Sequence, residues 1–289
     1  MKHLWQTTRF ELDVSSPLVM GIVNITPDSF STSHGSEDSH ALSARSIELS
    51  LAQMSAGAEL LDLGAESTRP GAQALGEDEE WARLLPVLKE VLTWHIPVSV
   101  DTYKPGIMQR ALDMGVDIIN DIFAFRQDGA LALMTKYSCG MCLMHMHGTP
   151  QTMQLSPMQG LVVEQVQGFL SERVRACEQM ELSLKRLMLD PGIGFGKTTD
   201  QNFALLARQG ELRVKGLPLL VGWSRKSSLG AVTGLEVGER LIPSVAAAVL
   251  AMERGAQVIR VHDVKETVAA KAVWQAQRHQ HVESRAPVL

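Results

Sequence analysis

Polar side chains end a series of short apolar runs, and these are the residues whose types could do chemistry. They are Asn24, Asp62, Asp101, Asn120, His145, Asp190, Lys226, Arg260 and His262. A buried strand has no packing reason to end in a charged group, because removing a charge from water is costly. Asp and Asn also cap helices at strand-to-helix turns, which explains any single one of them equally well. That explanation does not extend to Lys226, Arg260 or His262, because helix N-caps are not cationic.

Arg260 and His262 have a spacing that suits an anion. They lie two positions apart, so alternation along a strand places them on one face and Val261 on the other. A planar guanidinium and an imidazole N–H together suit a phosphate. A salt bridge beside a hydrogen-bonded histidine is the structural alternative for this tripeptide.

The preceding polar segment divides in the same way. Gly222, Ser224 and Lys226 share one face, whereas Arg225 points to the other. We therefore expect Lys226 to enter the site and Arg225 to form a structural ion pair.

A loop arginine adds a further candidate for anion binding. Thr68 and Arg69 lie in the segment ESTRPGA at 66–72, and Pro70-Gly71 after them is a turn signal. An arginine over the mouth of a barrel would clamp an anion, and a solvated loop charge is the alternative.

Acceptor groups at three run ends predict a flat ligand that is rich in N–H donors. Asp101, Asn120 and Asp190 end the third, fourth and sixth runs, and Phe195 follows in the next loop. An ionised carboxylate accepts two parallel hydrogen bonds from the edge of an amino-pyrimidinone. Lys226 would donate to a ring oxygen or nitrogen of the same ligand.

Eight strands are needed to position these residues. Near-continuous apolar runs are typical of parallel strands buried on both faces. The runs lie at 18–24, 59–64, 96–101, 117–122, 141–147, 186–192, 217–226 and 257–263. Helical patterns alternate with them, clearly over 44–58, 81–92 and 166–177 and more weakly over 104–115, 126–137, 200–214, 236–254 and 264–280. This alternation predicts an α/β fold, a (β/α)8 TIM barrel, with its site at the carboxyl ends of the strands.

Length and composition agree with a single barrel domain over residues 1–289. The chain is 45% hydrophobic and 20% charged, which excludes a disordered protein. Its net charge of −5 argues against a nucleic-acid partner. Three cysteines cannot form a paired secreted framework, so we expect a reducing, cytoplasmic location. We expect neither a signal peptide nor a membrane partner, because no apolar run reaches the ~18 residues of a membrane span.

Two motifs resemble other kinds of site. The sequence GIGFGKT at 192–198 suggests a Walker A loop, but that motif requires glycine where Pro191 stands. The sequence CGMCLMHMH at 139–147 contains zinc-ligand residue types. Ligands on one extended strand are too far apart to converge on a tetrahedral zinc ion. We therefore expect neither a nucleoside triphosphatase nor a structural zinc site.

Eight motifs at the predicted strand ends resemble dihydropteroate synthases. They are MGIVNITPDSFS (20–31), LDLGAESTRPGA (61–72), SVDTYKP (99–105), IINDI (118–122), LMHMHGTPQTM (143–153), LDPGIGFGKT (189–198), GWSRKSSLG (222–230) and IRVHDVKET (259–267). They occur in order over about Met20–Thr267, nearly the whole chain. The resemblance implies a pterin-binding TIM barrel of folate biosynthesis that uses Mg²⁺ and forms a homodimer. Its reaction would condense p-aminobenzoate with (7,8-dihydropterin-6-yl)methyl diphosphate to give 7,8-dihydropteroate and pyrophosphate.

The resemblance also implies roles for individual residues. The pterin pocket would consist of Asp101, Asn120, Met144, Asp190, Phe195, Gly222 and Lys226. The diphosphate would contact Asn24, Thr68, Arg69, Arg260 and His262, and Asn24 would also be linked to the metal. The p-aminobenzoate side, where sulfonamides compete, would include Phe30, Thr68, Pro70 and Ser224.

The implied mechanism is dissociative. The methylene C–O bond would break first, and the neutral arylamine would then attack without a strong general base. The catalytic set would be Asp101, Lys226, Arg260, His262 and Arg69. In this scheme Asp101 stabilises the pterin methylene cation, and the cationic residues with Mg²⁺ stabilise the leaving pyrophosphate.

Three related functions fit the same fold. A pterin-binding barrel of a methyltransferase would have no need for the anion-binding set, and a non-catalytic paralogue would be expected to lack Asn24 or Lys226. A sulfonamide-insensitive synthase is the third. It is suggested by Thr32–Ser36, which replace the usual Asp-Gly-Gly of the first loop, and by Trp223, whose bulk would narrow the p-aminobenzoate channel.

Overall fold

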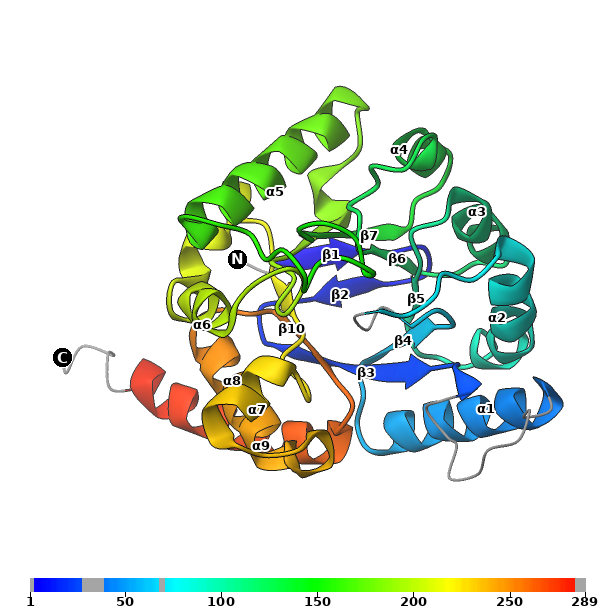
Figure 1. Ribbon diagram of the computed structural model, residues 1–289. Helices are drawn as coiled ribbons and strands as arrows, with labels where there is room; N and C mark the ends of the chain where they lie inside the picture. Colours follow the sequence, from blue (N-terminus) through cyan, green and yellow to red (C-terminus); the bar gives the residue numbers. More distant parts are fainter. Residues whose placement is uncertain (1–2, 28–38, 68–70, 284–289) are drawn as a thin grey trace.

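The computed structural model describes residues 3–27, 39–67 and 71–283, and eight parallel strands form its centre (Figure 1). The strands are β3 (Leu18–Asn24), β4 (Leu60–Gly64), β5 (Val98–Asp101), β6 (Ile118–Asp121), β7 (Gly140–Met144), β8 (Leu187–Asp190), β9 (Leu220–Val221) and β10 (Val258–Val261). They pair in the order β8-β7-β6-β5-β4-β3-β10-β9, and a parallel bridge between Leu189 and Leu219 closes the ring. The predicted (β/α)8 barrel is therefore confirmed.

Helices follow the strands and surround the ring (Figure 1). They are α1 (Ser39–Ser55), α2 (Glu77–Val91), α3 (Pro105–Asp113), α4 (Ala130–Leu133), α5 (Val162–Gln179), α6 (Thr199–Ala207), α7 (Ser227–Thr233), α8 (Leu241–Glu253) and α9 (Val264–Glu283). Short 3₁₀ turns lie at Met134–Lys136, Leu184–Arg186, Gln209–Leu212, Val214–Gly216 and Val237–Glu239. The weaker patterns thus marked real helices, but those predicted at 126–137 and 200–214 are shorter and continue as 3₁₀ turns.

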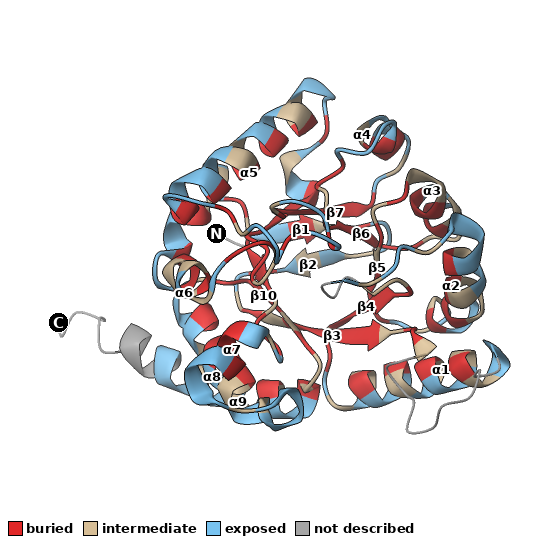
Figure 2. Ribbon diagram, viewed as in Figure 1, coloured by how far each residue is buried: buried red, intermediate tan, exposed pale blue. Residues whose placement is uncertain are grey.

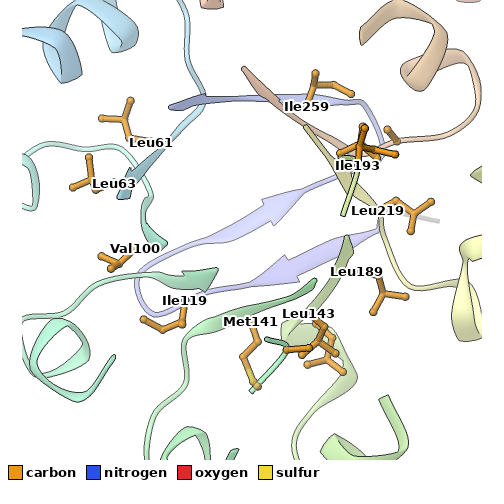
Figure 3. Packing of buried hydrophobic residues seen from close by; sticks show 14 of the residues in the cluster. Leu61, Leu63, Val100, Ile119, Met141, Leu143, Leu189, Ile193, Leu219 and Ile259 are labelled. Atoms are coloured by element: carbon orange, nitrogen blue, oxygen red, sulfur yellow. The ribbon is translucent and has the colours of Figure 1, made fainter. Parts of the chain in front are cut away.

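Alternate side chains on the strands build two separate cores. One set points outward and packs under the helices, as Figure 3 shows for Leu61, Leu63, Val100, Ile119, Met141, Leu143, Leu189, Leu219 and Ile259. The helices turn their buried faces toward the ring and leave their outer faces exposed (Figure 2). The second set points into the barrel and comprises Met20, Leu60, Ile118, Cys142, Met188, Leu220 and Val258. Burial on both faces explains why the strand sequences are almost continuously apolar.

A two-stranded hairpin closes the amino-terminal end of the barrel. Its strands, β1 (Leu4–Gln6) and β2 (Glu11–Asp13), pair antiparallel and cross the ring in Figure 1. Trp5 is fully buried in the inner core, and its Nε1 donates to the Arg186 carbonyl at 2.8 Å. Arg9, in the hairpin turn, forms an ion pair with the buried Asp117 at 2.6 Å. The sequence patterns did not predict this hairpin.

Candidate active site

A step of two residues along four strands changes the barrel interior from apolar to polar. The pairs are Leu60 and Asp62, Ile118 and Asn120, Met188 and Asp190, and Val258 and Arg260. Because alternate side chains point to the same face of a strand, the second member of each pair also faces the interior. These polar residues form a layer above the inner core, toward the carboxyl ends of the strands.

Arg260 is held by two carboxylates within this layer. Its Nε donates to Asp62 Oδ2 at 2.6 Å and its Nη2 to Asp101 Oδ2 at 2.9 Å. Burial alone would lower the pKa of Arg260, but Asp62 and Asp101 raise it above its ordinary value. Burial raises the pKa of Asp101 to about 7, because the compensating charge of Arg260 is shared with Asp62. The structural alternative for Arg260, a salt bridge, is thus present, and its Nη1 forms no hydrogen bond with the described residues.

Asp190, at the end of β8, comes together with Phe195 and Lys226 from two neighbouring loops. Asp190 Oδ1 accepts the backbone N–H of Gly192 at 2.7 Å, and burial raises the pKa of Asp190 to about 6. Lys226 Nζ lies 4.3 Å from the centre of the Phe195 ring. Burial, followed by the charge of Arg260, lowers the pKa of Lys226 to about 8. A carboxylate and an amine whose pKa values both move toward neutrality are typical of a functional site.

The glycine-rich loop after β8 packs against the end of β7. Gly192 and Gly196 have positive φ angles of 66° and 68°, a region that other residues rarely adopt. A Cβ at Gly192 would collide with the carbonyl oxygen of His145, and one at Gly196 with that of His147. These glycines therefore serve close packing between two loops, which agrees with rejecting a Walker A motif here.

Lys197 stabilises the same loop through hydrogen bonds to its backbone. Its buried Nζ donates to the carbonyl oxygens of Gly192 at 2.8 Å, Phe195 at 3.1 Å and His145 at 3.4 Å. Burial lowers the pKa of Lys197 to about 7. The side chain holds the backbone that carries Phe195, a role that the motif GIGFGKT did not reveal.

His262 and Ser224 form a hydrogen-bonded pair at the same end of the barrel. Ser224 Oγ lies 2.9 Å from His262 Nδ1 and accepts the backbone N–H of His262 at 3.2 Å. Burial, followed by the charge of Arg225, lowers the pKa of His262 to about 3, so its ring is neutral at pH 7. When the Ser224 hydroxyl donates to Nδ1, the ring proton resides on Nε2, which is then a donor. Arg225 pairs with Asp263 at 2.5 Å, as strand alternation predicted.

Three more residues of the predicted site lie within the described ranges. Met144 is buried in a small apolar cluster that Phe195 packs against. Asn24 ends β3 opposite Gly64 of β4. Gly222 follows β9, and an added Cβ would lie 3.9 Å from the Cβ of Arg260.

Part of the predicted site lies outside the described residues. It comprises Phe30, the first-loop segment Thr32–Ser36, and Thr68, Arg69 and Pro70. The chain on either side of 68–70 is anchored, because Glu66 accepts from Lys104 and from the backbone N–H of Leu75.

Trp223 does not face the barrel mouth. Its ring is buried in the outer core and packs against Phe203 of α6, with 5.3 Å between the two ring centres. The expectation that it narrows the p-aminobenzoate channel is therefore wrong. Leu220 belongs to the inner core and Val221 to the outer core, and the same alternation continued past β9 places Trp223 outward.

The two cysteines of the stretch CGMCLMHMH point to opposite sides of the barrel wall and do not converge on one site. Cys139 belongs to the outer core and Cys142 to the inner core, and both are unpaired. Within the described ranges, no group of three or more His, Cys, Asp or Glu side chains could hold a metal ion.

None of the helices in the described ranges is long and apolar enough to span a membrane.

The chain resembles a well-defined group of known proteins. Residues 20–262 match the family described as pterin binding enzyme. The dihydropteroate synthase of Neisseria meningitidis serogroup B is 46% identical over 282 residues, covering 95% of this chain and 98% of that relative. The structure of Xanthomonas albilineans dihydropteroate synthase with 4-aminobenzoic acid has a TM-score of 0.89 at 41% identity, covering 99% of this chain and 100% of that one. The structure of Burkholderia cenocepacia dihydropteroate synthase complexed with 7,8-dihydropteroate has a TM-score of 0.88 at 43% identity. The match covers 98% of this chain and 99% of that one.

The chain therefore belongs to the pterin-binding enzyme family. Within that family its activity is that of a dihydropteroate synthase, a transferase. The family resemblance of the eight motifs is confirmed. These relatives also favour the synthase over a methyltransferase-type barrel.

Proposed function

We propose that the polar layer of the barrel binds the pterin of (7,8-dihydropterin-6-yl)methyl diphosphate and that p-aminobenzoate attacks the methylene carbon from the loop side. The observation that supports this most is the set of acceptors in one buried layer. Asp101 accepts from Arg260, and Asn120 donates to the Asp62 carboxylate that Arg260 also contacts. The charge of Asp190 acts on both Arg260 and Lys226, and Lys226 stands over Phe195. A pterin edge offers several N–H donors to such acceptors, and its ring oxygen and nitrogens accept from Lys226.

The diphosphate would extend from the ring toward the ends of β3 and β10. Arg260 Nη1 and the neutral His262 ring present donors there, and Thr68 and Arg69 would complete the set from their loop. Asn24 offers an amide oxygen, a hard ligand that suits Mg²⁺, and this ion commonly takes its other ligands from substrate phosphates and water. Bound Mg²⁺ would neutralise part of the charge on the departing diphosphate.

As the C–O bond breaks, positive charge develops on the methylene carbon and negative charge on the pyrophosphate, and different residues of the chain would stabilise each. Asp101, ionised and beside the pterin, stabilises the positive charge that develops on the methylene carbon. Arg260, His262 and Arg69 bind the pyrophosphate that leaves with the bonding electron pair. The arylamine attacks as the neutral base and loses its proton afterwards. Phe30, Pro70 and Ser224 would line the p-aminobenzoate side, where sulfonamides compete.

The protein also has a surface suited to a second copy of this chain. Val232, Val237, Leu241 and Ile242 are exposed around α7 and the start of α8, and Ile242 is 79% exposed. Apolar patches of this kind mark association surfaces, and a two-fold dimer covers the same patch on both copies. We propose a homodimer through this face, tested by sedimentation velocity. Ile242→Glu should shift the protein from dimer to monomer, and an unchanged dimer would contradict the choice of surface.

We place the protein in a reducing, cytoplasmic compartment. This proposal is supported by three cysteines, Cys139, Cys142 and Cys177, that are buried and unpaired.

Pyrophosphate release tests the reaction. The purified protein is mixed with pterin diphosphate and Mg²⁺, with and without p-aminobenzoate, and the pterin product is identified by mass. We expect release that depends on p-aminobenzoate and that yields 7,8-dihydropteroate. Tight pterin binding without release under either condition would indicate a non-catalytic binding protein instead. Asp101→Asn with full turnover would contradict the role of Asp101 toward the cation.

A further inference from the structure

Asp62 is the centre of the polar layer, although none of the assigned roles includes it. Its side chain is fully buried. Its Oδ2 accepts from Arg260 Nε at 2.6 Å and from Asn120 Nδ2 at 3.1 Å. One carboxylate oxygen thus fixes two side chains from β6 and β10, and both belong to the proposed substrate site.

The contact with Asp62 determines which way the Asn120 amide is turned. A carboxamide has a donor nitrogen on one side and an acceptor oxygen on the other. The reversed amide would place Asn120 Oδ1 against Asp62 Oδ2, two acceptors at hydrogen-bond distance with no proton between them. Asp62 therefore turns Nδ2 toward itself and directs Oδ1 away.

The oxygen that is turned away has nothing to bind within the described protein. Asn120 Oδ1 is buried and has no hydrogen-bond partner among the described residues. Buried polar atoms in folded proteins are nearly always paired, so an unpaired acceptor calls for a ligand donor. An N–H group on the edge of a heterocycle meets that need.

We propose that Asp62 is a positioning residue of the pterin site, which sets Asn120 as an acceptor and so selects a ring that presents an N–H donor to it. The inference rests on the proposed function, because it takes Asn120 to contact the pterin. In this role Asp62 acts through Asn120 by its Oδ2, whereas its Oδ1 is also buried and has no partner among the described residues. A ring with an acceptor in place of that N–H would face Asn120 Oδ1 and bind poorly.

A double-mutant cycle tests this action through Asn120. The variants are Asp62→Ala, Asn120→Ala and the two combined, with Ser99→Ala as a matched control. Ser99 is buried and pairs in register with Asp62 on the neighbouring strand. Binding of 6-hydroxymethylpterin, which has the ring but no diphosphate, is measured by calorimetry, and kcat and KM are measured for both substrates.

We expect Asp62→Ala to weaken pterin binding about tenfold or more, as loss of a hydrogen bond to a charged group does. In the Asn120→Ala background the same change should cost less than about threefold, because Asn120 is already missing and this ligand has no diphosphate for Arg260, the other partner of Asp62, to bind. The KM for p-aminobenzoate and the binding by Ser99→Ala should remain within about twofold of wild type. An undiminished tenfold loss in the Asn120→Ala background would overturn the proposal. Equal increases in both KM values would also overturn it.

An exchange of the two groups covers the case in which Asp62→Ala does not fold. Asn120→Asp alone places two carboxylates in contact and should abolish pterin binding. Asp62→Asn combined with Asn120→Asp restores one donor and one acceptor across the contact and should recover most of that loss. No recovery would show that the hydrogen bond is not the cause. Because calorimetry requires no turnover, a protein that binds pterin without synthase activity would refute the reaction and leave this test intact.

Discussion

The lower and upper halves of the barrel interior lie on the same strands, yet they have opposite chemistry. The lower layer is apolar, fully buried and closed by Trp5 of the hairpin. The upper layer holds Asp62, Asn120, Asp190 and Arg260, and it contains buried polar atoms without partners in the described chain. Burial stabilises the fold in the first layer, whereas in the second it costs free energy and shifts pKa values. Under the proposed function, fold stability and ligand recognition are thus assigned to positions two residues apart along the same strand.

Trp5→Ala should have the largest effect, and on stability alone. Removing the ring leaves a cavity in the inner core and frees the Arg186 carbonyl, which together cost about 4 kcal/mol of unfolding free energy. Urea unfolding measures this loss, and the KM values of the folded variant should stay unchanged. A variant of normal stability with altered KM values would contradict the assignment of the lower layer to stability alone.

Asp190→Asn should affect activity and leave stability nearly unchanged. In the proposed site the carboxylate accepts from the N–H edge of the pterin, and the amide would turn a donor toward that edge instead. We therefore expect kcat/KM for pterin diphosphate to fall about 100-fold. The unfolding free energy should not decrease, because burial already disfavours the charged form of Asp190. Steady-state kinetics and urea unfolding of the same preparation test both statements. A decrease in stability with normal kinetics would place Asp190 with the lower layer.

The pH profile should reflect the shifted groups of the upper layer. Asp101 must be ionised, and burial raises its pKa to about 7 against the lowering effect of Arg260. Below that pH the carboxyl is protonated, so kcat/KM should fall about tenfold per pH unit, and more steeply below about 6 as Asp190 is protonated. Above about 8, loss of the Lys226 proton should lower kcat/KM again. In Asp101→Asn the decrease of kcat/KM below about pH 7 should disappear. If the decrease is unchanged, a group other than Asp101 causes it.

Lys197→Met should have the smallest of these effects. It removes the donor from three carbonyls and loosens the backbone that carries Phe195. We expect the KM for pterin diphosphate to rise about fivefold, with kcat nearly unchanged. Lys215→Met, which replaces a lysine that pairs with Glu178 at the surface, is the matched control. Equal KM values in the two variants would show that the loop holds Phe195 without Lys197.

Strand periodicity predicted much of the fold because parallel strands are buried on both faces. It also placed Arg225 correctly away from the site. The hairpin escaped prediction because strands of three residues are too short to show a period. The run at 217–226 contains only the short strand β9, which ends at Val221, and the chain then turns at Arg225, whose φ is 59°. Local sequence does not encode such a turn when the residue is not glycine.

Long-range contacts set the limit on predicting the site. Asp62 stands at a strand end like its neighbours, and only the closed barrel brings it to Arg260, 198 positions away. Lys197 is hidden in a motif that resembles a phosphate loop, although its partners are carbonyls of two packed loops. In both cases the residue type is visible in the sequence but its partner is not.

The ion pairs of Arg260 also bear on how the chain matures on the ribosome. Asp62 and Asp101 are synthesised long before the guanidinium that pairs with them, which arrives on the last strand of the barrel. Enclosing two carboxylates without their cation costs several kcal/mol for each charge. We therefore expect a nascent chain that lacks β10 to keep this end of the barrel open to water. The enclosed site would form only after β10 has emerged and paired with its neighbouring strands.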